Sequence, residues 1–312
     1  MSAVCNALPP LRGTAQHEGS LADFIWFRTG GPAEWLVRPQ DVHDLSVFLA
    51  GLDPATPVLP VGVGSNLIVR DGGVPGVVVR LPKAMAKVVV EPGNRVRAGG
   101  AAMGITVASA ARAAGIAGLE FLRGIPGTVG GAVKMNAGAY GRDTSDILIE
   151  ATVVTRSGEV ETWPAAKFGY VYRHSDVPAG AVVVEALFEG VPGDPVTIGA
   201  EMDRIAAERE ASQPLRSRTG GSTFKNPDGH KAWALIDQAG CRGLTRGDAQ
   251  VSEKHCNFLL NLGSATSAEI EALGEEVRQK VKEASGVMLE WEIQRVGVFA
   301  DDAGKSFVGV KK

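Results

Sequence analysis

The segment GIPGTVGGAVKMNAGAYG, residues 124–141, constrains the fold of this chain more than any other. It holds six of the chain's 40 glycines together with one proline. Glycine inside a packed element lowers stability, because it loses more conformational freedom on folding than any other residue. We therefore expect a flat backbone surface with few side chains, suited to a planar aromatic ligand or a pyrophosphate group. A cluster of structural turns is the alternative for this segment taken alone.

Two further glycine segments predict close approaches of the backbone. In GVGSN, residues 62–66, a glycine turn follows an apolar run. It is not a dinucleotide-binding fingerprint, because Leu67 stands in the place of the third glycine and no long helix begins there. Its backbone amides and the Ser65 hydroxyl still suit a pyrophosphate. In GGSTFKNP, residues 220–227, two consecutive glycines before Ser222 indicate either a surface turn or a close contact.

Composition and charge exclude several classes of protein. The 312 residues include 45% hydrophobic and 21% charged residues, as in an ordinary globular protein. The formal net charge of −3 argues against a protein that coats nucleic acid. The chain contains no uninterrupted run of about eighteen apolar residues, so the sequence predicts no membrane span. The five histidines are scattered without ligand spacing, so we expect no metal site.

The sequence also predicts a cytoplasmic location. The start MSAVCNALPPLRG lacks the basic leader and long apolar run of a signal peptide. Cys5, Cys241 and Cys256 are few, odd in number and widely spaced, which favours a reducing compartment over a disulfide framework.

The hydrophobic patterns predict a mixed α+β fold in at least two units that meet near residues 190–197. The clearest helix is 266–286, where Thr266 and Glu269 form a capping box and Gly286 ends the helix. Its apolar stripe is Ile270, Leu273, Val277 and Val281. Directly after this helix, the residues LEWEIQRV (289–296) alternate between apolar and polar like a strand, with Glu292 on the polar face. Further helices are expected over 39–52, with Asp41 as its cap, and over 105–115 and 196–211. Strands are expected over 57–61, 67–69, 76–81, 87–91 and 181–190, and residues 151–163 read as a hairpin with Ser157 and Gly158 at its turn.

Together these stretches resemble one family, the UDP-N-acetylenolpyruvoylglucosamine reductases of peptidoglycan synthesis. The matching segments keep the family's order and cover most of residues 24–297. They are FRTGGPAEWLV (27–37), PVGVGSNLIVRDGGVPGVVV (60–79), LEFLRGIPGTVGGAVKMNAGAYG (119–141), FGYVYRHS (168–175), GGSTFKNP (220–227), AWALIDQAGCRG with AQVSEKHCNF (232–258), and LEWEIQRVG (289–297).

The resemblance implies an FAD-dependent reductase of α+β fold. Two FAD-binding subdomains of the p-cresol-methylhydroxylase type, residues 1–85 and 86–195, hold the flavin without a covalent bond. A substrate-binding domain, residues 196–312, closes over a UDP-sugar. NADPH reduces the flavin, and the enolpyruvyl sugar is then reduced to UDP-N-acetylmuramate. The short connection YRHSDVPAGAVVVEALF implies the compact variant without an extra substrate-covering loop, and a monomer is expected.

The resemblance also assigns roles to individual residues. Ser222 matches the proton donor, Arg173 the catalytic arginine and Glu292 the catalytic glutamate. Beside a substrate carboxylate, the pKa of the Glu292 carboxyl is expected to rise. The substrate is assigned to Tyr172, Lys225, Asn226 and Lys254. FAD is assigned to Arg28, Thr29, Gly62, Gly64, Ser65, Asn66, Ile125, Pro126, Gly127, Thr128, Gly130 and Gly131.

Two departures from the family pattern and two alternative functions remain. His174 follows the arginine where an acidic or aromatic residue is common, and Trp291 precedes Glu292 where a basic or small residue is usual. One alternative is an FAD-dependent sugar or alcohol oxidase of the same domain type. Many such oxidases tether their flavin through a histidine, and the segments 62–66 and 124–141 contain none. The other alternative is a flavin-binding module without catalytic activity.

Overall fold

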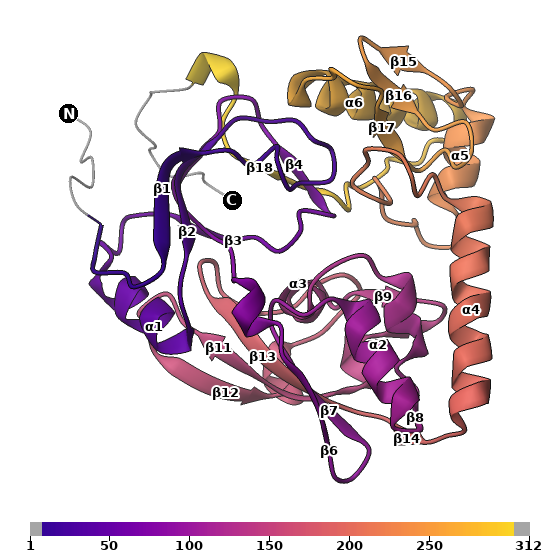
Figure 1. Ribbon diagram of the computed structural model, residues 1–312. Coiled ribbons are helices and arrows are strands. Elements are labelled where there is room, and N and C mark those ends of the chain that lie inside the picture. Colours follow the sequence, from indigo (N-terminus) through magenta and orange to yellow (C-terminus); the bar gives the residue numbers. More distant parts are fainter. Residues whose placement is uncertain (1–7, 303–312) are drawn as a thin grey trace.

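A computed structural model gives the structure over residues 8–302, so Cys5 and the last ten residues lie outside the described part of the chain (Figure 1). Helices and strands are mixed throughout, in the α+β class that the sequence predicts. None of the helices between residues 8 and 302 is long and apolar enough to cross a membrane. The α-helices there are α1 (Val42–Gly51), α2 (Gly104–Ala113), α3 (Val129–Met135), α4 (Pro195–Ser212), α5 (Ala232–Gln238) and α6 (Ser267–Ser285).

The N-terminal part is built on a sheet whose strands, in spatial order, are β1 (Thr14–Gly19), β2 (Ala33–Arg38), β5 (Val74–Val79) and β3 (Val58–Pro60). β1 and β2 are antiparallel, whereas β5 runs parallel to β2 and β3. Helix α1 begins at the predicted cap, where the Asp41 side chain accepts a hydrogen bond from the Asp44 amide. Its face of Leu45, Phe48 and Leu49 is buried.

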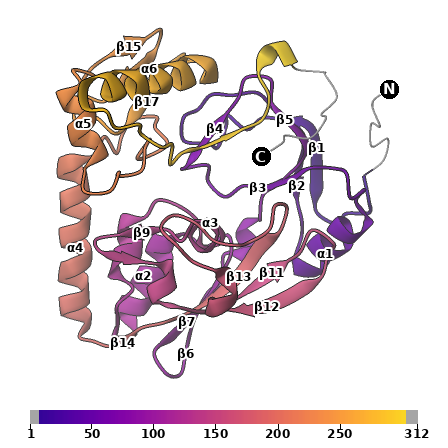
Figure 2. The ribbon, with the colours of Figure 1, turned by 180° about the vertical axis from the view of Figure 1, so that it is seen from behind.

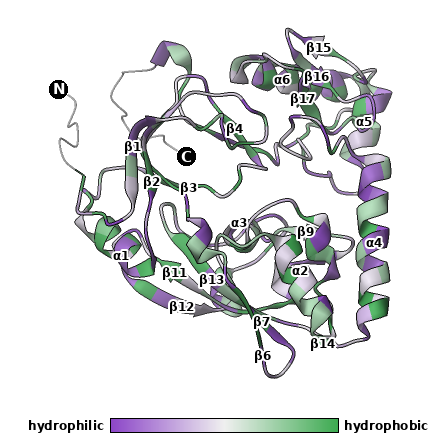
Figure 3. Ribbon diagram, in the orientation of Figure 1, coloured by the Kyte–Doolittle hydropathy of each residue, from purple (hydrophilic) through white to green (hydrophobic). Residues whose placement is uncertain are grey.

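The second sheet is antiparallel throughout, and its strands are, in spatial order, β12 (Val160–Pro164), β11 (Leu148–Val154), β13 (Val182–Glu189), β7 (Arg95–Gly99) and β6 (Val88–Glu91). The predicted hairpin forms from β11 and β12, and Gly158 in its turn has a φ of +86°. The central strand β13 is apolar along most of its length (Figure 3). Helices α2 and α3 pack against this sheet.

The glycine-rich segment 124–141 is not the flat backbone surface that the sequence suggested, because α3 lies inside it. Val129 and Val133 of that helix are buried in the hydrophobic core that packs on the second sheet. At Gly130 a Cβ atom would lie only 2.9 Å from the carbonyl oxygen of Val183 on β13. Part of the glycine content therefore serves close packing of a helix on a sheet.

Helix α4 runs along one side of the molecule and leads from the second sheet into the C-terminal part (Figures 1 and 2). There α5 and α6 pack with the strands β15 (Thr245–Arg246), β16 (Ala249–Val251) and β17 (Leu259–Asn261). Helix α6 has the predicted capping box of Thr266 and Glu269, and Gly286 ends it at a φ of +76°. The predicted stripe is fully buried, namely Ile270, Leu273, Val277 and Val281.

The predicted C-terminal strand is shorter than expected. Only β18 (Gln294–Val296) is a strand, and it pairs parallel with β4 (Leu67–Val69) of the N-terminal part. The prediction was wrong for the preceding residues because their hydrogen bonds go to a loop: Glu292 N donates to Thr223 O at 2.8 Å. The predicted alternation of burial holds at Leu289 and Ile293, which are both buried.

Short elements complete the described part of the chain. Two strand pairs connect loops at the surface: β8 (Ile116–Ala117) with β14 (Val191–Pro192), and β9 (Gly138–Ala139) with β10 (Arg142–Asp143). The 3-10 helices are η1 (Lys83–Met85), η2 (Glu120–Gly124), η3 (Thr144–Asp146), η4 (Ala165–Phe168) and η5 (Ala300–Asp302).

Candidate active site

A cavity of about 890 Å³ lies where the two N-terminal sheets and the C-terminal part meet. Its volume is near the upper end of the range for ligand pockets. The structure places most of the predicted site residues on its wall. These are Gly62, Gly64, Ser65, Asn66, Ile125, Pro126, Gly127, Thr128, Gly130 and Gly131 from the cofactor set, and Arg173, Ser222 and Glu292 from the catalytic set.

The glycine turn between β3 and β4 lies against the segment that precedes α3. The Ser65 hydroxyl donates a hydrogen bond of 2.6 Å to the carbonyl oxygen of Pro126. A Cβ atom at Gly62 would lie 2.5 Å from Thr128 Oγ1, so only glycine allows this approach. Gly64 has a φ of +62°, in the left-handed region that glycine adopts without strain. The two predicted glycine segments thus form one continuous wall.

The two residues before Ser222, Gly220 and Gly221, are glycine for different structural reasons. A Cβ atom at Gly220 would lie 2.5 Å from the ring of Phe27, whereas Gly221 has a φ of +82°. Both therefore let the chain turn tightly into the cavity. The next residue, Thr223, donates its amide to Asn257 O at 2.8 Å. This pairing fixes the backbone that carries Ser222.

Arg173 and Glu292 meet at the cavity wall. Arg173 Nε lies 2.9 Å from Glu292 Oε1, and the two side chains are 21% and 16% exposed. Arg173 Nη2 also donates to Gly138 O at 2.8 Å. The backbone of Arg173 has a φ of +57°, which is costly for a residue with a long side chain. The surrounding structure therefore holds this guanidinium in place against backbone strain.

Burial raises the pKa of the Glu292 carboxyl, and this effect exceeds the opposing influence of the Arg173 and Lys225 charges. The sequence-based expectation was that a substrate carboxylate would raise this pKa. In the structure the surrounding protein already does so. Glu292 is thus shifted toward the neutral acid, which can donate a hydrogen bond.

Two predicted cofactor residues do not line the cavity. Arg28 is exposed, with a φ of +56°, and its guanidinium donates to the carbonyl oxygen of Asp23. Thr29 follows it in the same loop. The structure does not bring either residue together with the glycine wall.

The predicted substrate residues are dispersed. Tyr172 is 52% exposed, and its ring centroid lies 4.8 Å from the guanidinium carbon of Arg173. Lys225 pairs with Glu290 at 3.3 Å. These two residues flank the cavity without lining it.

The other two predicted substrate residues already have partners within the protein. Asn226 Oδ1 accepts a hydrogen bond of 3.0 Å from the amide of Ala232, at the start of α5. Lys254 Nζ donates to Glu210 O at 2.5 Å and lines a second, smaller cavity of about 540 Å³.

Arg209 and Gln213, at the end of α4, line the main cavity but are not among the residues predicted from the sequence. Arg209 Nε donates to Gln213 Oε1 at 3.2 Å, and burial lowers the pKa of the guanidinium. A signal for Arg209 was present in the helix pattern. It follows the buried residues Met202 and Ile205 on the same face, where an arginine is unusual.

The residues on the wall fit an FAD molecule. Two glycine turns expose backbone along a long cavity, and Arg209 adds a cationic side chain next to it. Residues 33–163 match the FAD binding domain family, and residues 213–296 match the C-terminal domain of UDP-N-acetylenolpyruvoylglucosamine reductase. The fold and the site therefore define an FAD-dependent oxidoreductase.

Full-length relatives identify the family. A protein of Rhizorhabdus wittichii named UDP-N-acetylenolpyruvoylglucosamine reductase is 67% identical over 94% of this chain and 96% of its own length. One of the same name from Sphingopyxis alaskensis is 64% identical over 95% of this chain and 99% of its own. The crystal structure of the reductase from Thermus caldophilus, 32% identical, has a TM-score of 0.79 and covers 92% of this chain and 100% of that one. This chain belongs to the UDP-N-acetylenolpyruvoylglucosamine reductase family.

Proposed function

We propose that this chain reduces UDP-N-acetylglucosamine enolpyruvate to UDP-N-acetylmuramate with NADPH, and that Arg173, Glu292 and Ser222 act on the enolpyruvyl group. Bound FAD supplies the hydride transfer between NADPH and the sugar. The observation that carries the assignment is the 2.9 Å contact of Arg173 with Glu292 on the cavity wall that also holds Ser222.

Arg173 stabilises negative charge on the substrate. A hydride that reaches the β-carbon of the enolpyruvyl group leaves charge on the α-carbon and the adjacent carboxylate. The guanidinium is permanently charged and planar, so it binds such an enediolate with two parallel hydrogen bonds. Its contacts with Gly138 O and Glu292 fix its orientation before substrate arrives.

Glu292 assists as a neutral acid. Burial raises the pKa of its carboxyl, and the protonated form donates a hydrogen bond to the developing charge. An ionised carboxylate at this position would repel the substrate carboxylate. The protonated form is therefore the active one.

Ser222 delivers the proton to the α-carbon. A hydroxyl is a weak acid, so it serves only when it lies in contact with the reacting carbon and close to positive charge. The tight turn of Gly220 and Gly221 brings its backbone to the cavity, and Arg173 lies on the same wall.

The remaining assignments concern binding. The glycine segments 62–66 and 125–131 hold the FAD, and Tyr172 borders the substrate entrance beside Arg173. The partners of Lys225, Asn226 and Lys254 within the protein favour structural roles in the absence of substrate. We also propose that the two FAD-binding subdomains end at residues 85 and 195. Helix α4 begins at residue 195.

The chain acts as a monomer in the cytoplasm. One chain supplies Arg173, Ser222 and Glu292 to a single cavity, so the site needs no second copy. Cys241 and Cys256 are free buried thiols, which suits a reducing compartment. Light scattering during size-exclusion chromatography measures the molar mass in solution and so tests whether the protein is a monomer.

The spectrum of the purified protein tests the function. We expect a yellow protein whose visible flavin absorbance is bleached by NADPH and restored by the enolpyruvyl sugar. Oxygen consumption with a sugar alcohol, without NADPH, would favour the oxidase instead. FAD that stays bound without turnover of any enolpyruvyl substrate would favour a non-enzymatic flavin-binding module.

A further inference from the structure

The indole of Trp291, the residue directly before Glu292, lies in a notch on helix α6. The notch is Gly274: a Cβ atom there would lie 2.2 Å from the Trp291 ring. Glycine inside a helix costs about 1 kcal/mol relative to alanine. Because Gly274 has no side chain, the indole packs directly against the helix backbone. The side chain of any larger residue at position 274 would fill this space.

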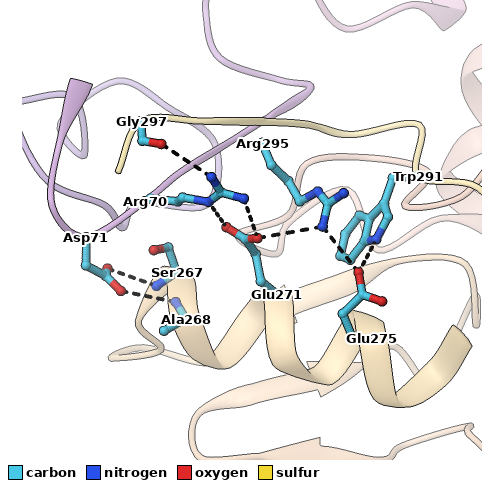
Figure 4. A network of polar contacts seen from close by, with 9 residues as sticks. All are labelled: Arg70, Asp71, Ser267, Ala268, Glu271, Glu275, Trp291, Arg295 and Gly297. Carbon is cyan, nitrogen blue, oxygen red and sulfur yellow. Dashed lines mark hydrogen bonds and ion pairs between the residues drawn. The ribbon is translucent and has the colours of Figure 1, made fainter. Parts of the chain in front are cut away.

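Polar contacts hold the indole in this notch. Trp291 Nε1 donates a hydrogen bond of 2.7 Å to Glu275 Oε1, and the same oxygen lies 3.2 Å from Arg295 Nη1. The Arg295 guanidinium also lies over the indole ring, 4.5 Å from its centroid. Figure 4 shows Trp291 and Arg295 side by side above Glu275. Phe224 packs at a centroid distance of 5.0 Å.

Helix α6 is itself fixed to the N-terminal part. Arg70, in the loop after β4, pairs with the buried Glu271 through Nε at 2.9 Å. The Asp71 carboxylate accepts hydrogen bonds from the amides of Ser267 and Ala268, at the start of α6 (Figure 4). The helix is therefore a rigid platform for the indole.

The backbone of Glu292, the residue after Trp291, is tied to the loop that carries Ser222 and to the glycine turn of residues 62–66. Glu292 N donates to Thr223 O at 2.8 Å, and Glu292 O accepts from Asn66 Nδ2 at 3.3 Å. A shift of Trp291 therefore moves Glu292 relative to Arg173, and it acts on the Ser222 loop through Thr223.

We propose that Trp291, seated on Gly274 and tethered by Glu275, is a positioning residue that sets the reach of the Glu292 carboxyl in the sugar half-reaction. This inference rests on the proposed function, because it requires that Glu292 act on the substrate. Trp291 itself does not line the cavity, so its action passes through the adjacent residue.

Stopped-flow flavin absorbance measures both half-reactions in the FAD-loaded full-length protein. Trp291→Phe keeps a ring and loses the N–H donor, so re-oxidation by the enolpyruvyl sugar should slow by about 10-fold. Gly274→Ala displaces the ring, so the loss should approach roughly 100-fold, as expected for a misplaced reacting group. Reduction by NADPH and FAD retention should stay near wild type in both variants.

A matched pair of substitutions on α6 separates positioning from general damage to the helix. Glu275→Ala removes the tether and should slow the sugar half-reaction. Glu283→Ala removes an exposed glutamate that only accepts a hydrogen bond from Gln279, and it should change neither half-reaction. The Gly274→Ala/Trp291→Ala double variant should be no slower than Trp291→Ala alone, because the ring that clashes has been removed.

The pH profile gives a readout that a purely structural role would not change. The charged and titratable groups facing Glu292 are Arg173, Tyr172 and Lys225. When the indole is displaced, water reaches the carboxyl and its raised pKa falls. The pH midpoint of the sugar half-reaction in Gly274→Ala should then lie below that of wild type.

Two results would overturn the inference alone, and a third would also refute the proposed role of Glu292. One is an unchanged sugar half-reaction in Trp291→Phe and Gly274→Ala, while Glu292→Gln remains slow; this leaves the proposed function intact. The other is an equal fall of both half-reactions with loss of FAD, which indicates unfolding of the site. If Glu292→Ala, which removes the donor altogether, is as fast as wild type, both the role of Glu292 and its positioning by Trp291 are refuted.

Discussion

Arg173 Nε and Glu292 Oε1 lie 2.9 Å apart, although 119 positions separate them in the sequence. One side chain comes from the loop before β13, and the other from the segment that leads into β18. Both side chains lie on the wall of the cavity, so the site combines residues from the N-terminal and C-terminal parts of the chain. In the proposed mechanism the sugar half-reaction therefore depends on both parts.

Arg173→Lys keeps the positive charge and loses the planar fork. We expect reduction of the enolpyruvyl sugar to slow by orders of magnitude, since lysine cannot bind a carboxylate with two parallel hydrogen bonds. Reduction of FAD by NADPH should change far less. Rapid-mixing measurements of each half-reaction check this. An equal fall in both would make Arg173 a structural residue.

Ser222→Ala should slow the sugar half-reaction while leaving the reduction of FAD by NADPH nearly unchanged. Gly220 and Gly221 set the backbone of the loop, so FAD stays bound and NADPH still reduces it. The second half-reaction should fall by roughly two to four orders of magnitude, as for loss of a positioned acid. Ser222→Cys should recover part of the rate, because a thiol has a transferable proton with a lower pKa. Fast re-oxidation of the alanine variant by the sugar would retire Ser222 as the donor.

Glu292 predicts a pH dependence with a definite sign. Its folded-state pKa is raised by burial, and in the proposed mechanism the neutral form acts, so the sugar half-reaction should be fastest below this pKa. The rate should fall as the pH rises through it. In Glu292→Gln the fall in rate that the titration of Glu292 causes should disappear from the pH–rate profile. The rate of the sugar half-reaction should also be lower than that of wild type at acidic pH. A Gln variant that keeps the wild-type limb would assign the titration to another group.

Gly220→Ala tests the tight contact with Phe27. A Cβ atom 2.5 Å from the ring must displace it, so the free energy of unfolding should fall by about 1–3 kcal/mol. Gly263→Ala is the control, since a Cβ atom there meets its nearest neighbour at 3.8 Å. Urea unfolding of both variants measures the difference. Equal stabilities would show that the Phe27 ring moves aside at no cost.

Asp71→Ala removes the acceptor for two amides at the start of α6. The free energy of unfolding should fall by about 1 kcal/mol, which is typical of a lost helix cap. Asp228→Ala changes an exposed aspartate in the turn before α5 and should have little effect. Thermal unfolding compares the two; matching melting temperatures would show that water replaces the Asp71 carboxylate.

Features with local causes could be predicted from the sequence. Helix α6 was predicted together with both of its ends, because the capping box, the apolar stripe and Gly286 all lie within the helix itself. The hairpin at Gly158 is local in the same way. The resemblance placed Arg173, Ser222 and Glu292 at one site, and the structure brings them to one cavity.

Features with distant causes could not be predicted. The segment before β18 alternates like a strand, but its hydrogen-bond partner is Thr223, far away in the sequence. Gly130 was assigned only to the cofactor, because nothing in the sequence shows that β13 also lies against it. Asn226 is engaged by the amide of Ala232, a contact that depends on how the loop before α5 folds back.

The parallel pairing of β18 with β4 has a consequence for the synthesis of the chain. β4 is made early, whereas its partner lies among the last residues of the described part. While the chain emerges from the ribosome, the edge of β4 stays without this partner until residues 294–296 have been made. Until residue 292 has also left the ribosome, Glu292 cannot reach Arg173, so the cavity wall described above is completed late in synthesis.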